Sequence, residues 1–460
     1  MLTLNLHPSQ SQRDETRVDA WLIRPFLSIF FSMQLVYITA GAAGMYCGSC
    51  MRDNTLANAL HAQGHSCLLI PTYTPIRVDE PDASASRIFF GGISVYLEQQ
   101  YRWLRRMPGW LDRLLSQRWL LRWVSRFAVN TRAEDLVDLT LSMLKGMHGH
   151  QRREIERLAH WLDRHHKPDV LCFTNVLLSG MFPEMQQRWS VPLYAVLQGD
   201  DIFLEFLPPA ARQEAIELIQ KNCAHVTGII TTCQAYADYM AAYLGLPRER
   251  MRVVYPGIHL KGYPQTRPVP VNQRLRIGYF ARIAPEKGLH QLVEAGTLLA
   301  QRQGIPPWEI QAAGYLGPQH QTYLQEQIDH AQKHGWGDRF CYLGELNHSA
   351  KLQFLSSLDL FSVPTTYREP KGLYLLEAQA CGVPAVQPDH GSFPELLEAT
   401  QGGVLFPANN AAALADQLEQ LLKDASRRQH LGSLAFQAIR EHFTDQHMAK
   451  ATLQVLTTSM

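Results

Sequence analysis

The chain has 460 residues, which is enough for two or three domains that each bury a core. Hydrophobic residues make up 46% of the chain and charged residues 18%, a composition that indicates a globular protein and excludes a largely disordered one. The formal net charge of +1 excludes a general attraction to nucleic acid, so any basic patch must be local.

Residues 1–32 do not resemble the remainder of the chain. Their apolar run over residues 21–31 is broken by Arg24 and Pro25 and is too short to span a bilayer. The run lacks a small-residue cleavage site, so we do not expect a secretory signal. Met33 stands directly before a clean strand pattern. We therefore interpret residues 1–32 as an extension, either an upstream start or a loose arm.

The first α/β unit begins after this extension. Residues 34–39 and 67–71 are short apolar runs that predict two buried parallel strands. Between them lie a glycine-containing loop and a helix predicted over residues 51–63, which Gly64 ends. A strand, glycine turn, helix and strand in this order place backbone amides where a ligand can approach them.

Two of the eight cysteines stand in that glycine turn, in the sequence Cys47-Gly48-Ser49-Cys50. A thiol at a helix N-terminus is acidified, so a thioredoxin-like redox role is one interpretation. Zinc would need a second pair of ligands, and none has the right spacing. We favour the other interpretation, two inert thiols that line a loop. The cysteines are too sparse for a disulfide scaffold, which favours a reducing compartment and a cytoplasmic location.

The composition changes between residues 102 and 132. Eight arginines there meet a single acid, Asp112, and four tryptophans are interleaved with leucines. A basic helix rich in tryptophan is typical of an element that lies on a membrane surface, here in contact with anionic lipid or an acidic acceptor. The alternative is a helical insertion, over about residues 100–150, whose arginines face water. The sequence leaves both interpretations open.

After residue 151 the alternation of helices and strands resumes. Strands are predicted over residues 169–173 and 192–197, and the second runs into Gln198, Asp200 and Asp201. Polar groups at the C-terminal ends of parallel strands are well placed to contact a substrate. Capping of the next helix is the alternative use of the two aspartates.

Further strands at residues 227–232 and 251–255 complete a first domain over residues 33–262. Residues 263–272 hold three prolines and no periodicity, so we place a linker there. A second α/β domain is predicted over residues 273–440. Its strands are predicted over residues 275–280, 309–313, 340–343, 360–363 and 404–406.

Two cations lie in the turn that follows the first strand of the second domain. Arg282 and Lys287 precede Gly288 and an amphipathic helix. They can converge on one anion, or they can be solvated, as surface Lys and Arg usually are.

The segment over residues 365–386 contains two carboxylates eight positions apart, Glu369 and Glu377. Residues 373–381 are mostly good helix formers, so a loop enters a helix at about Gly372. The first turn of such a helix offers free N–H groups and the positive end of a dipole. Glu369 lies at the mouth of this anion site and Glu377 about one turn inside it.

This segment resembles the E-x7-E signature of glycosyltransferase family 4, the retaining nucleotide-sugar transferases with the GT-B fold. The resemblance extends through Leu-Leu-Glu-Ala (375–378) and Cys-Gly-Val-Pro (381–384) and covers the chain from about Met33 onward. It implies two Rossmann-like α/β domains that face a central crevice, the first on the acceptor side and the second binding the donor. It also implies that residues 441–460 cross back to the first domain.

The resemblance assigns roles to individual residues. Arg282 and Lys287 match the family's Arg…Lys-Gly element, whose cations hold the donor's diphosphate, and the amides near Gly372 and Leu373 add to that site. By its spacing, Gly48 matches the family's N-terminal glycine loop and joins the donor-binding residues.

The carboxylates complete the expected site. Glu369 is expected to orient the sugar hydroxyls at the reacting centre, and Glu377 to hold the ribose. Asp200 is the second residue that we assign to catalysis, with helix capping as its alternative.

Two positions depart from the family pattern. Pro370-Lys371-Gly372 stands where the family has Gly-aromatic-Gly, and Gln198 stands where it commonly has a histidine. We therefore assign no catalytic histidine.

The implied function is a hexosyltransferase that moves a sugar from a nucleotide diphosphate to a glycan, lipid or small-molecule acceptor, with retention at the anomeric carbon. Such transferases serve cell-envelope or polysaccharide biosynthesis. No Asp-x-Asp metal site is evident near the donor elements, so we expect no metal and no other cofactor, with protein cations in their place. The alternatives are a sugar phosphorylase or nucleotide-sugar epimerase on the same fold, or a non-catalytic relative that binds carbohydrate or lipid.

Overall fold

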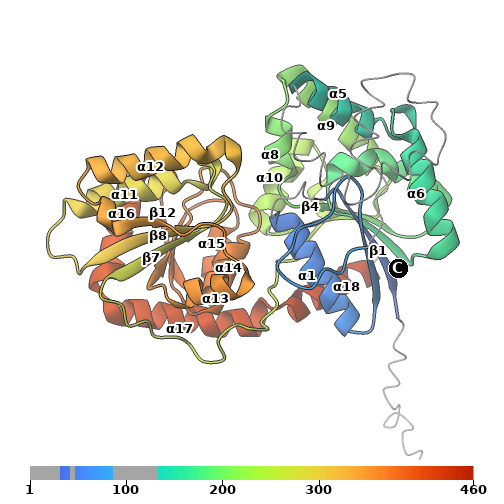
Figure 1. Cartoon of the computed structure of the whole chain (residues 1–460). Coiled ribbons are helices and arrows are strands. Elements are labelled where there is room, and N and C mark those ends of the chain that lie inside the picture. Colours follow the sequence, from blue (N-terminus) through green and yellow to red (C-terminus); the bar gives the residue numbers. More distant parts are fainter. Residues whose placement is uncertain (1–31, 42–46, 86–132, 459–460) are drawn as a thin grey trace, which may run out of the picture.

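A computed structural model of the chain describes residues 32–41, 47–85 and 133–458 (Figure 1). The N-terminal extension up to residue 31 and the Arg/Trp-rich stretch over residues 102–132 lie outside the described residues.

Six parallel strands form the sheet of the first domain, in the spatial order β2-β1-β3-β4-β5-β6. The strands are β1 (Gln34–Thr39), β2 (Ser66–Pro71), β3 (Val170–Phe173), β4 (Leu193–Leu197), β5 (Gly228–Thr231) and β6 (Met251–Val253). The residues of β3, β4 and β5 are all buried, as expected where helices cover both faces of a parallel sheet.

A second parallel sheet of six strands forms the other domain, in the order β12-β11-β10-β7-β8-β9. The strands are β7 (Leu275–Phe280), β8 (Trp308–Ala313), β9 (Phe340–Tyr342), β10 (Leu360–Phe361), β11 (Ala385–Pro388) and β12 (Gly403–Phe406). The strands predicted from the sequence are present, with ends within two residues, and β11 is an addition. It escapes a pattern search because only two apolar residues, Ala385 and Val386, precede the polar Gln387.

Helices surround both sheets. Those of the first domain are α1 (Gly48–Ala62), α5 (Ala133–Leu144), α6 (Arg152–His165), α7 (Phe182–Arg188), α8 (Asp200–Glu205), α9 (Pro209–Cys223) and α10 (Gln234–Leu244). Those that follow are α11 (Leu289–Ala300), α12 (Gln321–Lys333), α13 (His348–Ser356), α14 (Leu373–Ala380), α15 (Phe393–Thr400), α16 (Ala411–Lys423), α17 (Ala425–His442) and α18 (Asp445–Thr457). Short 3-10 turns lie at Gly146–His148, Val176–Met181, Arg248–Arg250, Pro285–Lys287, Pro318–His320 and Gly337–Arg339.

The chain crosses between the domains twice. Helix α17 runs along the second domain, and α18 packs on the first, where Met448 and Leu456 join the core of β1 and α1 (Figure 1). The two crossings are hydrogen-bonded to each other, because Ile258 N donates to Phe443 O (3.0 Å) and Asp445 N donates to Ile258 O (2.9 Å).

None of the helices in the described part of the chain combines the length and the apolar character needed to cross a bilayer.

Candidate active site

The strand order places two loops opposite each other. In an open parallel sheet, ligands bind at the carboxyl ends of the strands where the order reverses. The order reverses between β7 and β10 in the second sheet and between β1 and β3 in the first. The turn after β7 holds Arg282 and Lys287, and the segment after β10 holds Glu369. The α/β pattern thus brings together residues that lie more than eighty positions apart.

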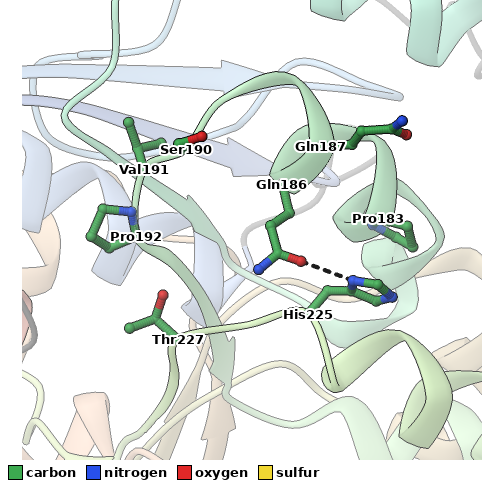
Figure 2. Close-up of a pocket in the computed structure, with 8 residues that line it drawn as sticks. All are labelled: Pro183, Gln186, Gln187, Ser190, Val191, Pro192, His225 and Thr227. Atoms are coloured by element: carbon green, nitrogen blue, oxygen red, sulfur yellow. Dashed lines mark hydrogen bonds between the residues drawn. The ribbon is translucent and has the colours of Figure 1, made fainter.

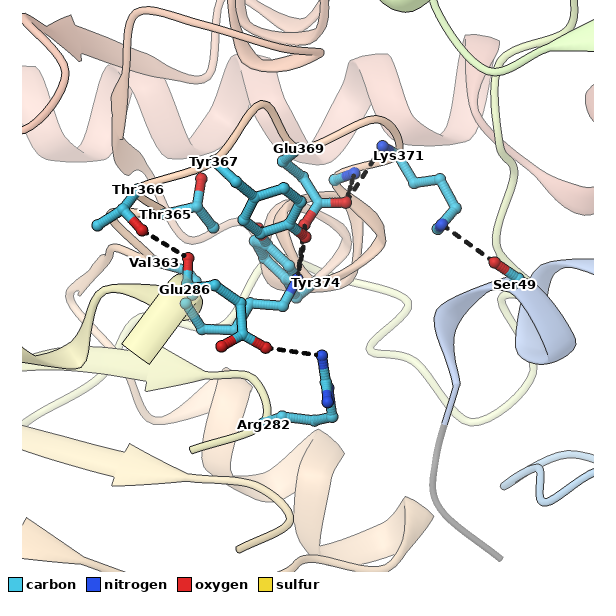
Figure 3. Close-up of polar contacts among 12 residues, drawn as sticks. Ser49, Arg282, Glu286, Val363, Thr365, Thr366, Tyr367, Glu369, Lys371 and Tyr374 are labelled. Carbon is cyan, nitrogen blue, oxygen red and sulfur yellow. Dashed lines mark hydrogen bonds and ion pairs between the residues drawn. The ribbon is translucent and has the colours of Figure 1, made fainter. Parts of the chain in front are cut away.

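Glu369 is buried among hydrogen-bond donors. Its Oε2 accepts from Lys287 Nζ (2.7 Å), from Tyr374 OH (3.0 Å) and from Tyr367 OH (Figure 3). Burial acts to raise the pKa of Glu369, but Lys287 and Lys371 outweigh it and hold that pKa well below its ordinary value. The carboxylate is therefore ionised throughout the neutral range.

The backbone that follows Glu369 binds the other carboxylate oxygen. Oε1 accepts from Lys371 N (3.2 Å) and from Gly372 N (3.4 Å). Gly372 has φ +63°, a conformation that side chains rarely adopt, and α14 begins at the next residue, Leu373, as the sequence predicts. The first amides of α14 have no partner within the helix, so the positive helix end lies beside Glu369.

Lys287 lies in a confined position. Its Nζ is 4.8 Å from the ring centroid of Tyr367 and 5.3 Å from that of Tyr374. Burial lowers the pKa of Lys287, an effect that Glu369 opposes. The turn itself is held close to the β10 segment, because a Cβ on Gly288 would lie 1.8 Å from Pro364 O.

Arg282 is the more exposed cation of the pair. Its Nη2 lies 3.0 Å from Glu286 Oε1, and the two side chains are 37% and 33% exposed. Lys287 is thus bound to Glu369, whereas the one ion pair of Arg282 in the described part of the chain is partly solvated.

Glu377 belongs to a chain of charges that joins the two domains. Its Oε1 lies 2.7 Å from Lys351 Nζ on α13, and the same ammonium binds Asp79 of the first domain. Burial raises the pKa of Glu377, and Lys351 opposes this. Asp79 and Lys351 escape sequence reasoning because each is an isolated charge without a local pattern.

Other polar contacts also cross the domain interface. Thr232 Oγ1 donates to Pro370 O (2.6 Å), and Arg77 pairs with Glu345, which follows β9. Glu395 of the second domain accepts from the first amides of α10 and from Tyr255 OH (2.7 Å). The two strand-end faces are thus in direct contact, and the acidic and basic residues of the site lie between them.

Asp200 binds backbone. Its Oδ1 accepts from Val176 N (2.8 Å) and its Oδ2 from Gln198 N (2.9 Å), and burial raises its pKa to about 6. Both oxygens thus hold the loops that follow β3 and β4. The catalytic assignment of Asp200 stays a prediction, and these contacts support a positioning role. The neighbouring Asp201 accepts from Tyr236 OH (2.6 Å).

Gln198 connects the core of the first domain to the interface. Its Nε2 donates to both oxygens of the buried Asp53 (3.3 and 3.2 Å) and to Thr174 O (3.2 Å). Its backbone O accepts from Lys371 Nζ, and its buried Oε1 has no partner among the described residues.

Gly48 lies in the first turn of α1, because that helix begins three residues before the predicted start. A Cβ on Gly48 would lie 3.4 Å from Lys371 Cε, so the glycine allows the second domain to come close. The neighbouring Cys47 and Cys50 form no disulfide with each other, and the hydrogen bond from Cys50 lowers the pKa of Cys47.

The described residues contain no group of three or more His, Cys, Asp or Glu side chains that could hold a metal ion.

A separate hollow of about 730 Å³ lies at the other end of the first sheet (Figure 2). Pro192 and Thr227, which line it, precede β4 and β5, so the hollow is at the amino ends of these strands. His225 Nδ1 and Gln186 Oε1 are 2.8 Å apart there. Neither the strand ends nor these side chains connect the hollow with the Glu369 site.

Two family models match the chain. Residues 139–257 match the glycosyl transferase 4-like domain, and residues 267–437 match the glycosyl transferases group 1. Together they span more than half of the chain, and residues 258–266 lie between them.

Curated relatives are similar over about two thirds of the chain. A glycogen synthase of Mycobacterium tuberculosis is 27% identical over 295 residues, which cover 64% of this chain and 69% of that protein. A D-inositol 3-phosphate glycosyltransferase of Paenarthrobacter aurescens is 27% identical over 320 residues, 66% of this chain and 76% of that one.

Solved structures share the fold. The sucrose-phosphate synthase of Thermosynechococcus elongatus superposes with a TM-score of 0.67 at 17% identity, over 92% of this chain and 98% of that one. HepE of Anabaena in complex with UDP gives a TM-score of 0.64 at 17% identity, over 93% and 100%. Taken with the two domain models, the strand order and the glycosyltransferase relatives, these matches show that the chain belongs to glycosyltransferase family 4 and has the GT-B fold.

Proposed function

We propose that this glycosyltransferase moves a hexose from a nucleotide-diphosphate donor to a glycan, lipid or small-molecule acceptor, with retention of the anomeric configuration. The observation on which this rests is the meeting of Glu369, Lys287 and the N-terminus of α14 at the strand-order reversal of the second sheet. HepE, which shares the fold, has been solved with UDP and with UDP-glucose. That likeness supports a nucleotide sugar as the donor.

The chemistry follows from the charges. Departure of the diphosphate leaves positive charge on the sugar and negative charge on the phosphates. Arg282, Lys287 and the first amides of α14 stabilise the phosphates, and the ionised Glu369 stabilises the sugar. The protein's own cations supply the charge that a divalent metal supplies elsewhere, so we propose transfer without a metal ion.

Glu369 serves this scheme as a fixed negative charge. Its two oxygens are engaged by one ammonium, two phenols and two amides, and its pKa is held well below the ordinary value. A carboxylate so fully bound is a weak base and a weak nucleophile. We therefore assign it to orienting the sugar and stabilising its charge.

The test of the function is product analysis. Thermal-shift screening against a panel of nucleotide sugars identifies the donor, and incubation with that donor with and without acceptor follows. We expect slow release of sugar without acceptor and transfer with it. Phosphate-dependent release would instead identify a phosphorylase, isomerised donor an epimerase, and no turnover a binding protein.

Replacing Glu377 by alanine is expected to raise the donor KM about tenfold or more with little change in kcat. A carboxylate that accepts from two ribose hydroxyls contributes alike before and during the reaction. Steady-state kinetics with the identified donor measure both constants. The control is Asp79→Ala, which removes the other ion-pair partner of Lys351 and leaves Glu377 in place. A loss confined to kcat in Glu377→Ala would contradict the ribose assignment.

We further propose that the Arg/Trp-rich stretch over residues 102–132 holds the enzyme against an anionic membrane surface, as its composition indicates. We expect sedimentation with anionic vesicles and release as the salt concentration rises. Replacing Arg105, Arg106 and Arg113 by glutamate should abolish sedimentation and leave donor binding unchanged. Equal partitioning to neutral and anionic vesicles would instead indicate a packed insertion.

A further inference from the structure

Lys371 presents a buried ammonium group at the domain interface. The residue is 9% exposed, and its Nζ lies 3.2 Å from Ser49 Oγ and also donates to Gln198 O. Figure 3 shows the side chain extending from the Glu369 loop to Ser49 on α1, away from Arg282. Both partners of the ammonium are neutral groups of the first domain.

The other buried lysines of the site are paired with carboxylates. Lys287 binds Glu369, and Lys351 binds Glu377 and Asp79. Lys371 makes no ion pair within the described part of the chain. Taking an ammonium out of water costs more free energy than neutral hydrogen bonds return, so such a group is usually paired with an anion. Among the residues that the structure describes, no carboxylate is paired with Lys371.

The nearby carboxylates do not supply it. Glu369 is in contact with Lys287, and with Lys371 nearby the three groups carry one positive charge in excess. Asp200 and Asp201 also feel the charge of Lys371, but Asp200 binds two backbone amides and Asp201 accepts from a tyrosine hydroxyl. Neither lies within ion-pair distance of Lys371.

The groups around the ammonium favour a negative ligand. The first turn of α1, which contains Ser49, has no acidic residue and no side-chain cap. Two glycines adjoin Lys371: a Cβ on Gly199 would lie 3.7 Å from its Nζ, and one on Gly48 would lie 3.4 Å from its Cε. The buried Oε1 of Gln198 has no partner and can accept from a hydroxyl group. The N-terminus of α1, an ammonium that has only neutral partners among the described residues, and the unpartnered Oε1 of Gln198 thus belong to neighbouring residues.

We propose that Lys371 binds an anionic oxygen of the substrate, from a carboxylate or a phosphate, on the first domain's side of Glu369. This deepens the proposed function and rests on it. The anion has three sources: the donor's diphosphate, a charged group on the transferred sugar, or a charged group on the acceptor.

The competing role for Lys371 is purely structural: its hydrogen bonds to Ser49 and Gln198 would hold the two domains together without binding an anion. A matched control separates the two roles, because Thr232 Oγ1 donates across the same interface to the adjacent Pro370 O (2.6 Å). Thr232→Val removes this contact and no charge. Lys371→Met removes the charge and keeps most of the length, whereas Lys371→Arg keeps a cation.

The experiment compares these three variants with the full-length wild type. Calorimetry measures affinity for pyrophosphate, UDP, UDP-glucose and UDP-glucuronate, and kinetics measure KM for neutral and anionic acceptors. We expect Lys371→Met to lose about tenfold or more in affinity for at least one anion, corresponding to one charge-assisted contact. Lys371→Arg should retain most of that affinity, and Thr232→Val all of it. Ligand-free Lys371→Met should melt at the wild-type Tm or above, because an unpaired buried charge has been removed.

The pattern of losses identifies the source. Weaker pyrophosphate and UDP binding indicates the diphosphate, a loss specific to UDP-glucuronate indicates the sugar, and a raised KM for an anionic acceptor alone indicates the acceptor. Affinities and KM values within twofold of wild type for every ligand would overturn the proposal, as would equal losses in Thr232→Val. A wild type that binds these anions without transferring sugar would refute the proposed function and leave the anion site standing.

Discussion

Glu369→Ala is expected to lower kcat by about three orders of magnitude, the scale of losing one fixed charge that stabilises a transition state. The donor KM should stay unchanged or fall, because the alanine releases Lys287 from its only carboxylate partner among the described residues and leaves that ammonium free for the diphosphate. Steady-state kinetics with the identified donor measure both constants. The two alanine variants of the E-x7-E motif should therefore differ in kinetics: Glu369→Ala should lower kcat, and Glu377→Ala should raise the donor KM.

Glu369→Ala is also expected to lower the stability of the folded protein. Breaking a buried ion pair by removing one partner costs about 3 kcal/mol or more, so the ligand-free Tm should fall and pyrophosphate should restore it. The lowered pKa of Glu369 means that this contribution to stability is present above its ordinary pKa of 4.5 and is lost as the pH falls below it. The difference in stability between wild type and Glu369→Ala should shrink accordingly in acid.

Glu369→Gln is the matched variant. It keeps the size and some hydrogen bonds and loses the negative charge, so it should recover little kcat. The assignment of Glu369 to the reacting sugar would be wrong if Glu369→Ala kept kcat and only weakened donor binding.

Arg282→Ala is expected to reduce turnover by about a hundredfold or more, because a charged contact to the diphosphate is lost. Stability should hardly change, since the ion pair with Glu286 is about one-third exposed and such pairs contribute little. Activity at a fixed donor concentration measures the loss of turnover, and calorimetry with UDP measures the loss of affinity for the diphosphate.

Glu286→Gln provides the control for Arg282. It removes the only ion-pair partner of the guanidinium in the described residues and leaves the cation in place. We expect turnover at the wild-type level or slightly above it. Near-normal donor binding in Arg282→Ala would show that this arginine does not hold the diphosphate.

Several charged residues of the site also connect the two domains. Lys371, Lys351 and Glu395 each connect the domains, and two adjacent chain crossings lie beside Ile258. Under the proposed function, charges at this interface therefore act both on the substrate and on the approach of the domains. Paired controls such as Thr232→Val and Asp79→Ala are needed to separate the two effects.

The sequence by itself determined every strand of the two sheets except β11, and it determined the start of α14. Strands such as β4 (residues 193–197) can be recognised in the sequence because a strand that is buried on both faces consists almost entirely of apolar residues. Gly372 marks the helix start because its positive φ and the helix formers after it are local properties. For the same reason the E-x7-E motif could be recognised within one short segment.

Only the tertiary structure decided which charges meet. Lys287 and Glu369 lie 82 positions apart, and Lys371 lies 322 positions from Ser49. These contacts depend on the order of the strands and on how the two domains approach each other. Neither can be predicted from the periodicity of a local segment. Local patterns record which face of an element is buried, whereas the partner of a buried charge is set by whatever element the fold brings opposite it. The unbalanced ammonium of Lys371 therefore became visible only when both domains were in place.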